Sequence, residues 1–374
     1  MFNLHMDLLN SVLDLAVPPV SLVLLAFAWP ALSFINSCEW IYGVFFAENM
    51  EDKVVIITGA SSGIGEQIAY EYAKRKANLV LVARRLNRLT GISENAREFG
   101  AKNVMIFAAD VIKEEDCRRF VTETVNFFGH VDHLVNTASL GHTFYFEEAN
   151  DSSVFPIIMD INFWGNVYPT YAALPYLRES NGRIVVNASV ESWLPLPRMS
   201  LYSAAKAALV NFYETLRFEV KDDVGITVAS HGWIGSEMSG GKFMLEDGAE
   251  MQWKEEREVH VSGGPVKEFA KLIVKGACRG NSHVRYPSWY DTFLLYRFFA
   301  PKILNWTLQL LYANDSRRNS LIGTGRPLLE AAPATAASSS SSPSSSLTQS
   351  PPRKYFASSG SFPPSPVHPM SKLE

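Results

Sequence analysis

Hydrophobic positions are distributed unevenly along the chain, and their pattern divides it into three parts. Residues 15–38 contain no charged side chain. From about residue 50, short apolar runs rich in valine and isoleucine alternate with longer segments of helical periodicity. Serine and proline supply about half of residues 331–374, which leaves too little apolar surface to offset the entropy of ordering. The pattern predicts an apolar N-terminal segment (residues 1–49), one folded domain (residues 50–325) and a disordered tail (residues 326–374).

The folded domain has the pattern of an α/β protein. Its predicted strands are apolar along nearly their whole length, and helical segments separate them. Such strands are typical of a parallel sheet that helices cover on both faces. The predicted strands are residues 53–58, 79–83, 104–108, 132–136, 182–188 and 225–231, with a helix over residues 65–76 after the first of them.

The N-terminal segment is long enough to cross a bilayer core of roughly 30 Å as a helix. Pro18, Pro19 and Pro30 interrupt it, and each lacks a backbone N–H, so we expect either a spanning helix or a proline-bent hairpin. Its length and lack of amphipathic character argue against a buried core helix. The first basic residue is Lys53, which argues against a cleaved signal peptide and leaves the orientation open. We therefore expect residues 15–38 to bind a membrane or lipid-droplet surface.

Composition narrows the class of protein further. The chain has 34 Lys and Arg against 38 Asp and Glu, a net charge of −4, so it lacks the basic excess of a nucleic-acid-binding protein. Three widely spaced cysteines exclude a disulfide framework and a zinc cluster. The mean hydropathy of +0.00 is high for a soluble enzyme, in keeping with work at a lipid surface.

A glycine-rich turn follows the first predicted strand. Residues 58–65 read TGASSGIG and lead directly into the first predicted helix. Glycines at such a turn let the backbone approach a pyrophosphate, which is then bound at the helix N-terminus. The predicted dinucleotide contacts in this turn are Gly59, Ser61, Ser62, Gly63, Ile64 and Gly65.

The end of the second predicted strand bears on cofactor choice. An acidic residue there would accept a hydrogen bond from the ribose 2′-hydroxyl of NAD. Arg84 and Arg85 occupy this place instead. Because guanidinium groups pair with the 2′-phosphate, we expect NADP as the cofactor.

A third motif combines a serine, a tyrosine and a lysine. Tyr202 and Lys206 are four residues apart and share one face of a helix, while Ser189 directly follows a predicted strand. Ligands of open α/β sheets bind at such strand ends. An ammonium group near the phenol is expected to lower the tyrosine pKa, which suits an acid/base at neutral pH.

Together these motifs resemble the short-chain dehydrogenase/reductase family over residues 53–287. The resemblance implies a Rossmann-like, doubly wound sheet of about seven strands and hydride transfer between NAD(P) and a carbonyl or alcohol. It implies that Tyr202 is the acid/base, that Ser189 holds the substrate oxygen and that Lys206 binds the nicotinamide ribose. Other positions that match the family pattern are Asn162 in a proton relay through water, Asp110 and Val111 beside the adenine, and Asn136 among the cofactor contacts.

Two positions depart from the family pattern. Ser139 replaces a glycine in the segment after the fourth strand, and His231 replaces a proline after the sixth. A serine at the first position is expected to crowd the nicotinamide side, and loss of the proline to loosen the entry to the substrate loop. Neither change removes a reacting group.

The proline-interrupted N-terminal segment, the run TGASSGIGEQ, the run ALPYLR and the late apolar segment together give a closer resemblance. Over most of residues 1–312 the chain resembles the steroleosins, plant oil-body proteins described as 11-beta-hydroxysteroid dehydrogenase-like. This resemblance implies an NADP-dependent hydroxysteroid or sterol dehydrogenase at a lipid-droplet or endoplasmic-reticulum surface. The alternatives are a reductase of another lipid carbonyl, such as a long-chain ketone, retinoid or terpenoid, and an NADP-binding structural or signalling protein that is only weakly catalytic.

Two late segments bear on substrate and partners. Residues 233–264 form a long insertion whose Met and aromatic content suits a flat apolar ligand, or packs the loop itself. Residues 289–312 are rich in aromatics and leucine and fit a membrane-dipping element, a homodimer interface or core packing. Asn187 begins a glycosylation triplet that includes Ser189, and this favours a catalytic domain facing the cytosol.

Overall fold

The computed structural model describes residues 2–61, 63–141, 144–149, 152–232, 242–243, 252–253 and 265–310. Ser62, nearly all of the predicted substrate loop over residues 233–264 and the whole predicted tail lie outside these described residues. Two short strands, β7 (Lys242–Phe243) and β8 (Gln252–Trp253), pair antiparallel within the loop region.

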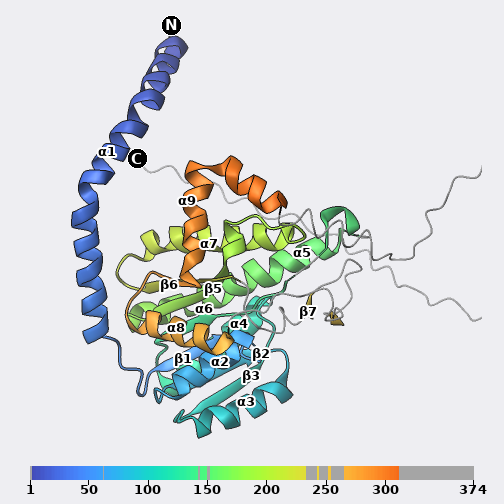
Figure 1. Ribbon diagram of the computed structural model, residues 1–374. Helices are drawn as coiled ribbons and strands as arrows, with labels where there is room; N and C mark the ends of the chain where they lie inside the picture. The colour runs from blue at the N-terminus through green and yellow to red at the C-terminus, as the bar shows by residue number, and fades with distance from the viewer. Residues whose placement is uncertain are drawn as a thin grey trace, which may run out of the picture. The chain divides into compact units, whose positions relative to one another are not determined.

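The domain is built on a seven-stranded sheet in the order β3-β2-β1-β4-β5-β6-β9 (Figure 1). Every neighbouring pair in this sheet is parallel, which confirms the predicted doubly wound α/β fold. The six predicted strands are present as β1 to β6. The seventh strand, β9, is short and of mixed polarity, and the hydrophobic pattern does not reveal it. The strands are β1 (Val54–Thr58), β2 (Asn78–Ala83), β3 (Val104–Ala108), β4 (His133–Asn136), β5 (Arg183–Ser189), β6 (Gly225–His231) and β9 (His283–Tyr286).

Helices cover both faces of the sheet, and successive residues of a strand pack against opposite layers. In β1, Val55 and Ile57 belong to one apolar cluster, while Val54 and Ile56 belong to the other. This alternation follows from the two-residue period of a strand, and burial on both faces explains why the strands are apolar throughout. The first layer contains α2 (Gly63–Ala73), α3 (Leu86–Glu98) and α8 (Val266–Cys278), and the second α4 (Glu114–Phe128), α6 (Gly165–Glu179) and α7 (Ser200–Val220).

Shorter elements lead into α6 and α7. Helix α5 (Val154–Met159) continues into a π-helical turn over Asp160–Trp164, and a 3₁₀ turn, Val190–Ser192, follows β5. Further 3₁₀ turns cover Phe146–Glu148 and Ser288–Tyr290. A π-helical turn inside a longer helix frequently marks a functional site.

The apolar N-terminal segment forms one long helix, α1 (Phe2–Phe45), which Figure 1 shows as continuous and bent. Pro18, Pro19 and Pro30 lie inside it. They therefore do not interrupt the helix as the sequence predicted, nor does the chain turn back as a hairpin here. A proline removes one backbone hydrogen bond and bends a helix, but intact turns on both sides can maintain it. By length and composition residues 12–45 can cross a membrane. The apolar 18-residue stretch that meets this criterion has no buried residue.

The segment that joins α1 to β1 is bound to the domain. The Glu48 carboxylate lies 3.0 Å from Nε2 of the buried His133, and the Glu48 N–H donates to the Cys278 carbonyl over 2.7 Å. Met50 is buried in the first apolar layer. The folded domain thus begins a few residues after α1 ends.

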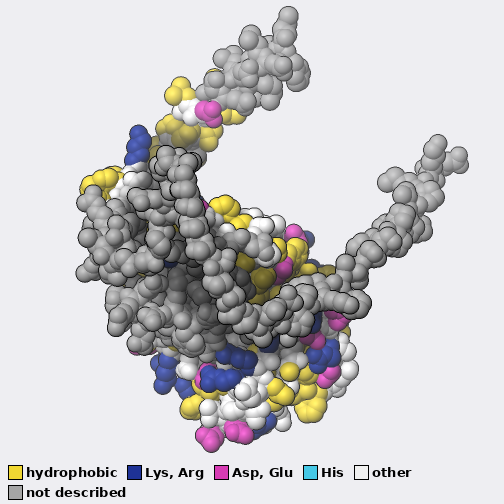
Figure 2. Space-filling model, turned by 90° about the vertical axis from the view of Figure 1, so that its right-hand side faces the viewer, with side chains coloured by type: hydrophobic (Ala, Val, Ile, Leu, Met, Phe, Trp, Pro, Cys, Tyr) yellow, Lys and Arg dark blue, Asp and Glu magenta, His cyan; other side chains and the backbone are white. Residues whose placement is uncertain are grey.

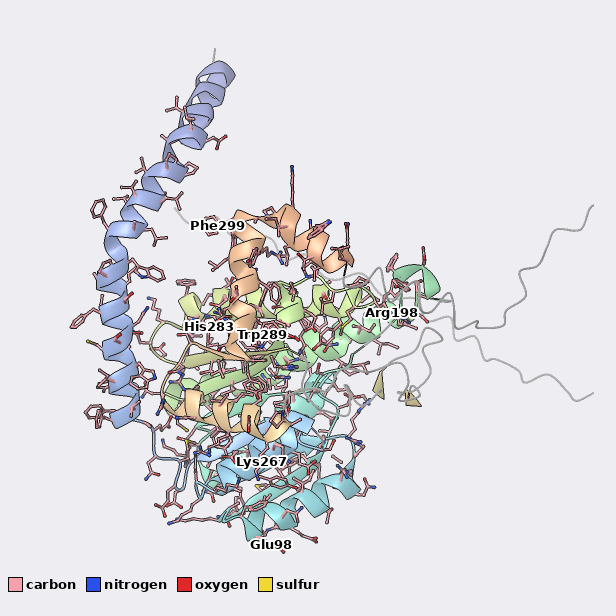
Figure 3. All side chains as sticks on the ribbon, viewed as in Figure 1. Glu98, Arg198, Lys267, His283, Trp289 and Phe299 are labelled. Atoms are coloured by element: carbon pink, nitrogen blue, oxygen red, sulfur yellow. The ribbon has the colours of Figure 1, made fainter. Side chains whose placement is uncertain are left out.

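The segment over residues 289–312 is helical and mostly exposed where the structure describes it, although Leu304 is buried. After Ser288–Tyr290 come α9 (Asp291–Phe299) and a helix over residues 301–310. Figure 3 shows Trp289 near the start of α9 and Phe299 at its far end. Trp289, Phe298 and Phe299 are 56%, 76% and 73% exposed, so the core-packing alternative does not hold for these side chains.

Candidate active site

The candidate residues meet at the carboxyl edge of the sheet. Because the strands are parallel, the residues that end or follow β1, β4, β5 and β6 share this edge. Ser189 ends β5, and His231 ends β6 directly opposite it in the register. The chain order reverses between β1 and β4, which is the place where ligands of such sheets bind.

The glycine turn after β1 is packed tightly against the segment after β4. A Cβ on Gly59 would lie 2.7 Å from the Ala138 nitrogen, and Gly59 has a left-handed φ of +67°. A Cβ on Gly65 would lie 2.5 Å from the Gly59 carbonyl oxygen. These positions therefore require glycine, and α2 begins within the turn at Gly63 with its free N–H groups. The turn has the shape and polarity of a phosphate cradle.

Arginine side chains surround Ser61 at this turn. Nη2 of Arg85 donates to the Ser61 hydroxyl over 3.1 Å and to its carbonyl over 3.3 Å. Nε of Arg88 donates to the same carbonyl over 3.4 Å, while Arg84 is exposed at the end of β2. Arg88 is not among the residues predicted from the sequence, although its position one helical turn after Arg85 is a usable signal.

The remaining predicted cofactor residues differ in what their side chains do. Val111 is buried, and the Asp110 carboxylate accepts from the Ile112 N–H over 3.4 Å. The Asn136 amide instead points into the protein, donating to Thr170 Oγ1 over 2.9 Å and to the Tyr213 hydroxyl over 3.1 Å. The Asn136 amide therefore ties β4 to α6 and α7, and the contact of this residue with a cofactor stays a prediction.

Ser189, Tyr202 and Lys206 form a buried cluster. Their exposures are 2%, 1% and 0%. Tyr202 and Lys206 lie one turn apart on α7, and the Lys206 Nζ lies 5.7 Å from the Tyr202 ring centroid. This Nζ also donates to the Asn187 carbonyl of β5 over 2.9 Å, and the Ser189 side chain is near enough to the Tyr202 phenol to influence its pKa. The structure thus brings the predicted serine, tyrosine and lysine together.

Burial dominates the protonation of this cluster. Desolvation raises the pKa of Tyr202 above its ordinary value, and the charge of Glu191 raises it further. Desolvation also lowers the pKa of Lys206 to about 7. The expected lowering of the tyrosine pKa by the ammonium group is therefore wrong for this structure, because loss of water penalises both charged forms.

Asn162 and Ser139 extend the cluster towards α6. Asn162 is buried in the π-helical turn, where its amide donates to the carbonyls of Leu140 and Ile158 over 2.7 and 2.9 Å. The Ser139 hydroxyl donates to Asn162 Oδ1 over 2.7 Å, and its interaction with the Tyr202 phenol lowers the pKa of that phenol, against the effect of burial. Ser139, expected only to crowd the site, therefore binds the asparagine and lies near the tyrosine.

His231 and Asn187 are both buried. Nδ1 of His231 donates to the Gly232 carbonyl over 2.7 Å, and burial lowers the pKa of this imidazole to about 4, so it is neutral at physiological pH. Its ring packs on Phe269 at 5.3 Å between centroids, so this residue is held firmly without proline. Asn187 is 5% exposed in β5. The folded domain cannot present it for glycosylation, and the triplet carries no information about topology.

Glu191 is a residue of this site that the sequence analysis missed. It lies in the turn after β5, is 6% exposed, and its carboxyl is hydrogen-bonded with the Ser189 hydroxyl. A glutamate two positions after a candidate active-site serine was the available signal, but only the fold shows that the side chain turns inwards.

Curated relatives are similar to the chain over most of its length. It is 75% identical to 11-beta-hydroxysteroid dehydrogenase B of Sesamum indicum, over 87% of this chain and 91% of that protein. It is 72% identical to 11-beta-hydroxysteroid dehydrogenase-like 5 of Arabidopsis thaliana, over 85% of this chain and 82% of that protein. The predicted resemblance to plant proteins described as 11-beta-hydroxysteroid dehydrogenase-like is confirmed.

Solved structures and a family model agree with this similarity. The chain aligns with an alcohol dehydrogenase from Thermococcus sibiricus complexed with 5-hydroxy-NADP, at 27% identity and a TM-score of 0.54, over 64% of this chain and 98% of that one. A short chain dehydrogenase/reductase from Burkholderia phymatum in complex with NAD shares the fold, at 21% identity and a TM-score of 0.59, over 67% of this chain and 94% of that one. The family model for short chain dehydrogenases matches residues 53–244. The chain belongs to the short-chain dehydrogenase/reductase family of oxidoreductases.

Proposed function

We propose that this protein is an NADP-dependent oxidoreductase that interconverts a hydroxyl and a ketone on a steroid or sterol at a lipid surface. The observation that carries the proposal is the buried cluster of Ser189, Tyr202 and Lys206 beside the glycine turn. The names of its plant relatives support a hydroxysteroid substrate.

Each residue of the cluster has a distinct task in ketone reduction. Tyr202, kept protonated by its burial, donates a hydrogen bond to the substrate oxygen and then its proton. Ser189 donates a second hydrogen bond to the same oxygen and stabilises the charge that develops there. Lys206, bonded to the Asn187 carbonyl, holds its ammonium group behind the phenol, from which a proton can be replaced. Ser139 and Asn162 extend this hydrogen-bonded path.

The glycine turn and the arginines fit a dinucleotide phosphate. Side chains on Gly59 or Gly65 would fill the cradle, and basic groups converge on Ser61 beside it. When bound, NADP supplies or accepts the hydride. Gly59, Gly63 and Gly65 would hold the pyrophosphate, Arg84, Arg85 and Arg88 the 2′-phosphate, and Asp110 and Val111 the adenine.

Replacing Arg84 and Arg85 together by alanine is expected to raise the KM for NADPH about 10- to 100-fold, because charge-assisted contacts to the 2′-phosphate are lost. The KM for NADH, which has no such phosphate, is expected to change less than about threefold. Initial rates with both cofactors measure this. The control is Arg97→Ala at the far end of α3, and equal losses for NADPH and NADH would contradict the assignment.

The substrate class is tested with purified full-length protein, NADPH and a panel of keto-steroids, long-chain ketones, retinal and terpenoid ketones. We expect oxidation of NADPH with one or more steroids, and hydroxysteroid product by mass spectrometry. Turnover of only the other lipid carbonyls would replace the steroid assignment. Cofactor binding without turnover on any of them would favour the weakly catalytic alternative.

The proposed location is the surface of a lipid droplet or the endoplasmic reticulum. The apolar α1, whose residues 12–45 have the length to cross a membrane, supports attachment to lipid. The apolar side chains exposed on α9 support a second contact with lipid or with another copy of the chain. On the face in Figure 2, by contrast, basic and acidic side chains are interspersed over the lower part of the domain.

A further inference from the structure

Glu191 places a carboxyl group inside the candidate active site. It lies in the 3₁₀ turn Val190–Ser192, two residues after Ser189, and is 6% exposed. Its Oε2 is hydrogen-bonded with the Ser189 hydroxyl, and its charge interacts with Tyr202 and Lys206. A buried carboxyl group is costly to keep in a protein, so its contact with a reacting group calls for a functional explanation.

The serine hydroxyl has a single proton and two neighbouring acceptors. One is the Glu191 carboxyl, and the other is the His231 carbonyl oxygen, 3.2 Å from Ser189 Oγ. A carbonyl oxygen only accepts, and so does an ionised carboxylate, whereas a protonated carboxyl can also donate. An ionised Glu191 therefore captures the serine proton. A protonated Glu191 donates to Ser189 Oγ and leaves the serine proton able to turn towards a substrate oxygen.

The surroundings of Glu191 favour its protonated form. Desolvation raises the pKa of Glu191, and this effect outweighs the hydrogen bond with Ser189, the residue's own backbone N–H and the nearby Lys206, which all lower the pKa. Among the described residues, the groups that interact with the carboxyl are Ser189 from β5 and Tyr202 and Lys206 from α7. Of these only Lys206 can carry a charge that favours the carboxylate near neutral pH, and burial also shifts Lys206 towards its neutral form.

We propose that Glu191 is a positioning residue, which as a protonated carboxyl donates to Ser189 and frees the serine hydroxyl to bind the oxygen of a carbonyl substrate. The inference rests on the proposed carbonyl chemistry and adds a residue to it. Glu191 acts through Ser189 and does not itself contact the substrate.

A double-mutant cycle on the full-length protein tests this dependence. We expect Glu191→Ala to lower kcat for ketone reduction about 10- to 30-fold and Ser189→Ala about 100-fold. The double variant is expected to match Ser189→Ala alone within about threefold, since Glu191 then has no serine to orient. Losses that multiply, or a wild-type kcat in Glu191→Ala, would overturn the proposal.

A conservative variant distinguishes loss of the orientation of the Ser189 hydroxyl from general disruption of the site. Glu191→Gln keeps a neutral donor of the same shape, and is expected to recover most of the activity lost in Glu191→Ala. Wild-type kcat for reduction is expected to fall as rising pH ionises Glu191 and deprotonates Lys206. In Glu191→Gln only the fall due to Lys206 is expected to remain, because an amide does not ionise. An identical pH profile in both proteins would overturn the proposal.

The control is Glu98→Gln at the exposed end of α3, which Figure 3 shows well separated from Trp289. It is expected to match wild type throughout. NADPH binding, followed by fluorescence, and thermal unfolding verify that each variant is folded.

The outcomes distinguish the two proposals. If the wild type turns over no carbonyl substrate, the proposed function fails. If the wild type is active but the effects of the two substitutions are additive, only the proposed role of Glu191 fails.

Discussion

Replacing Tyr202 by phenylalanine is expected to lower kcat about 10³- to 10⁴-fold while leaving NADPH affinity within about threefold of wild type. The reason is that phenylalanine keeps the buried ring in place but removes the phenol hydroxyl that lies near Ser189 and is the proposed proton donor. General acid catalysis contributes up to about this factor. Stopped-flow or steady-state NADPH oxidation with a keto-steroid gives kcat, and fluorescence titration gives the affinity.

Tyr213→Phe is the matched control, because Tyr213 is also a fully buried tyrosine of α7. Its hydroxyl is 2.7 Å from Thr170 Oγ1 and donates to the Asn166 carbonyl over 2.9 Å, away from the Ser189 cluster. We expect Tyr213→Phe to cost about 1–3 kcal/mol of stability and less than about fivefold in kcat. Wild-type turnover by Tyr202→Phe, or an equal loss in both variants, would end the assignment of Tyr202 as the proton donor.

Deleting residues 1–46 is expected to move the protein from the lipid-bound fraction to the soluble fraction, a change of at least about 100-fold in partitioning. The deletion removes the apolar α1, whose membrane-length part is unburied, and burial of apolar surface is the driving force for lipid binding. It retains Glu48 and Met50, which pack on the domain. Flotation with phospholipid vesicles and with oil-in-water droplets measures the partitioning, and steroid-dependent NADPH oxidation verifies that the domain is intact.

The matched control is the full-length protein with Phe298→Ser and Phe299→Ser, which removes the two most exposed aromatic side chains of α9 but keeps α1. This variant is expected to float with lipid as wild type does. If the truncated protein still floats, and loses flotation only when both phenylalanines are also replaced, then α9 and not α1 is the main lipid contact.

Much of the fold could be predicted because its signals are local. The strands β1 to β6 are continuous apolar runs, and the predicted bounds of β3 and β6 agree with the structure. The run HVRY of β9 was missed because charged and apolar residues alternate in it, and only pairing with β6 defines it as a strand. The prolines of α1 were read as interruptions, yet the helix continues through them.

Only some residues of the candidate active site could be predicted from the sequence. Tyr202 and Lys206 share a helix face by spacing alone, and Ser189 follows a predictable strand. Asn136 was placed among cofactor contacts, but its amide binds α6 and α7 residues far away in the sequence. Ser139, Arg88 and Glu191 were undervalued or missed because their partners come from other elements of the fold.

The sequence by itself determined the alternation of strands and helices, the glycine turn, the Tyr202–Lys206 pair and the apolar N-terminal segment. These depend on backbone period, turn chemistry and the polarity of neighbouring residues. Only the tertiary structure decided that α9 lies exposed, that Ser139 binds Asn162 and that Glu191 reaches Ser189. It also reversed the expected pKa shift of Tyr202. The physical reason is that hydrogen-bond partners and loss of water are set by packing between segments that are distant along the chain.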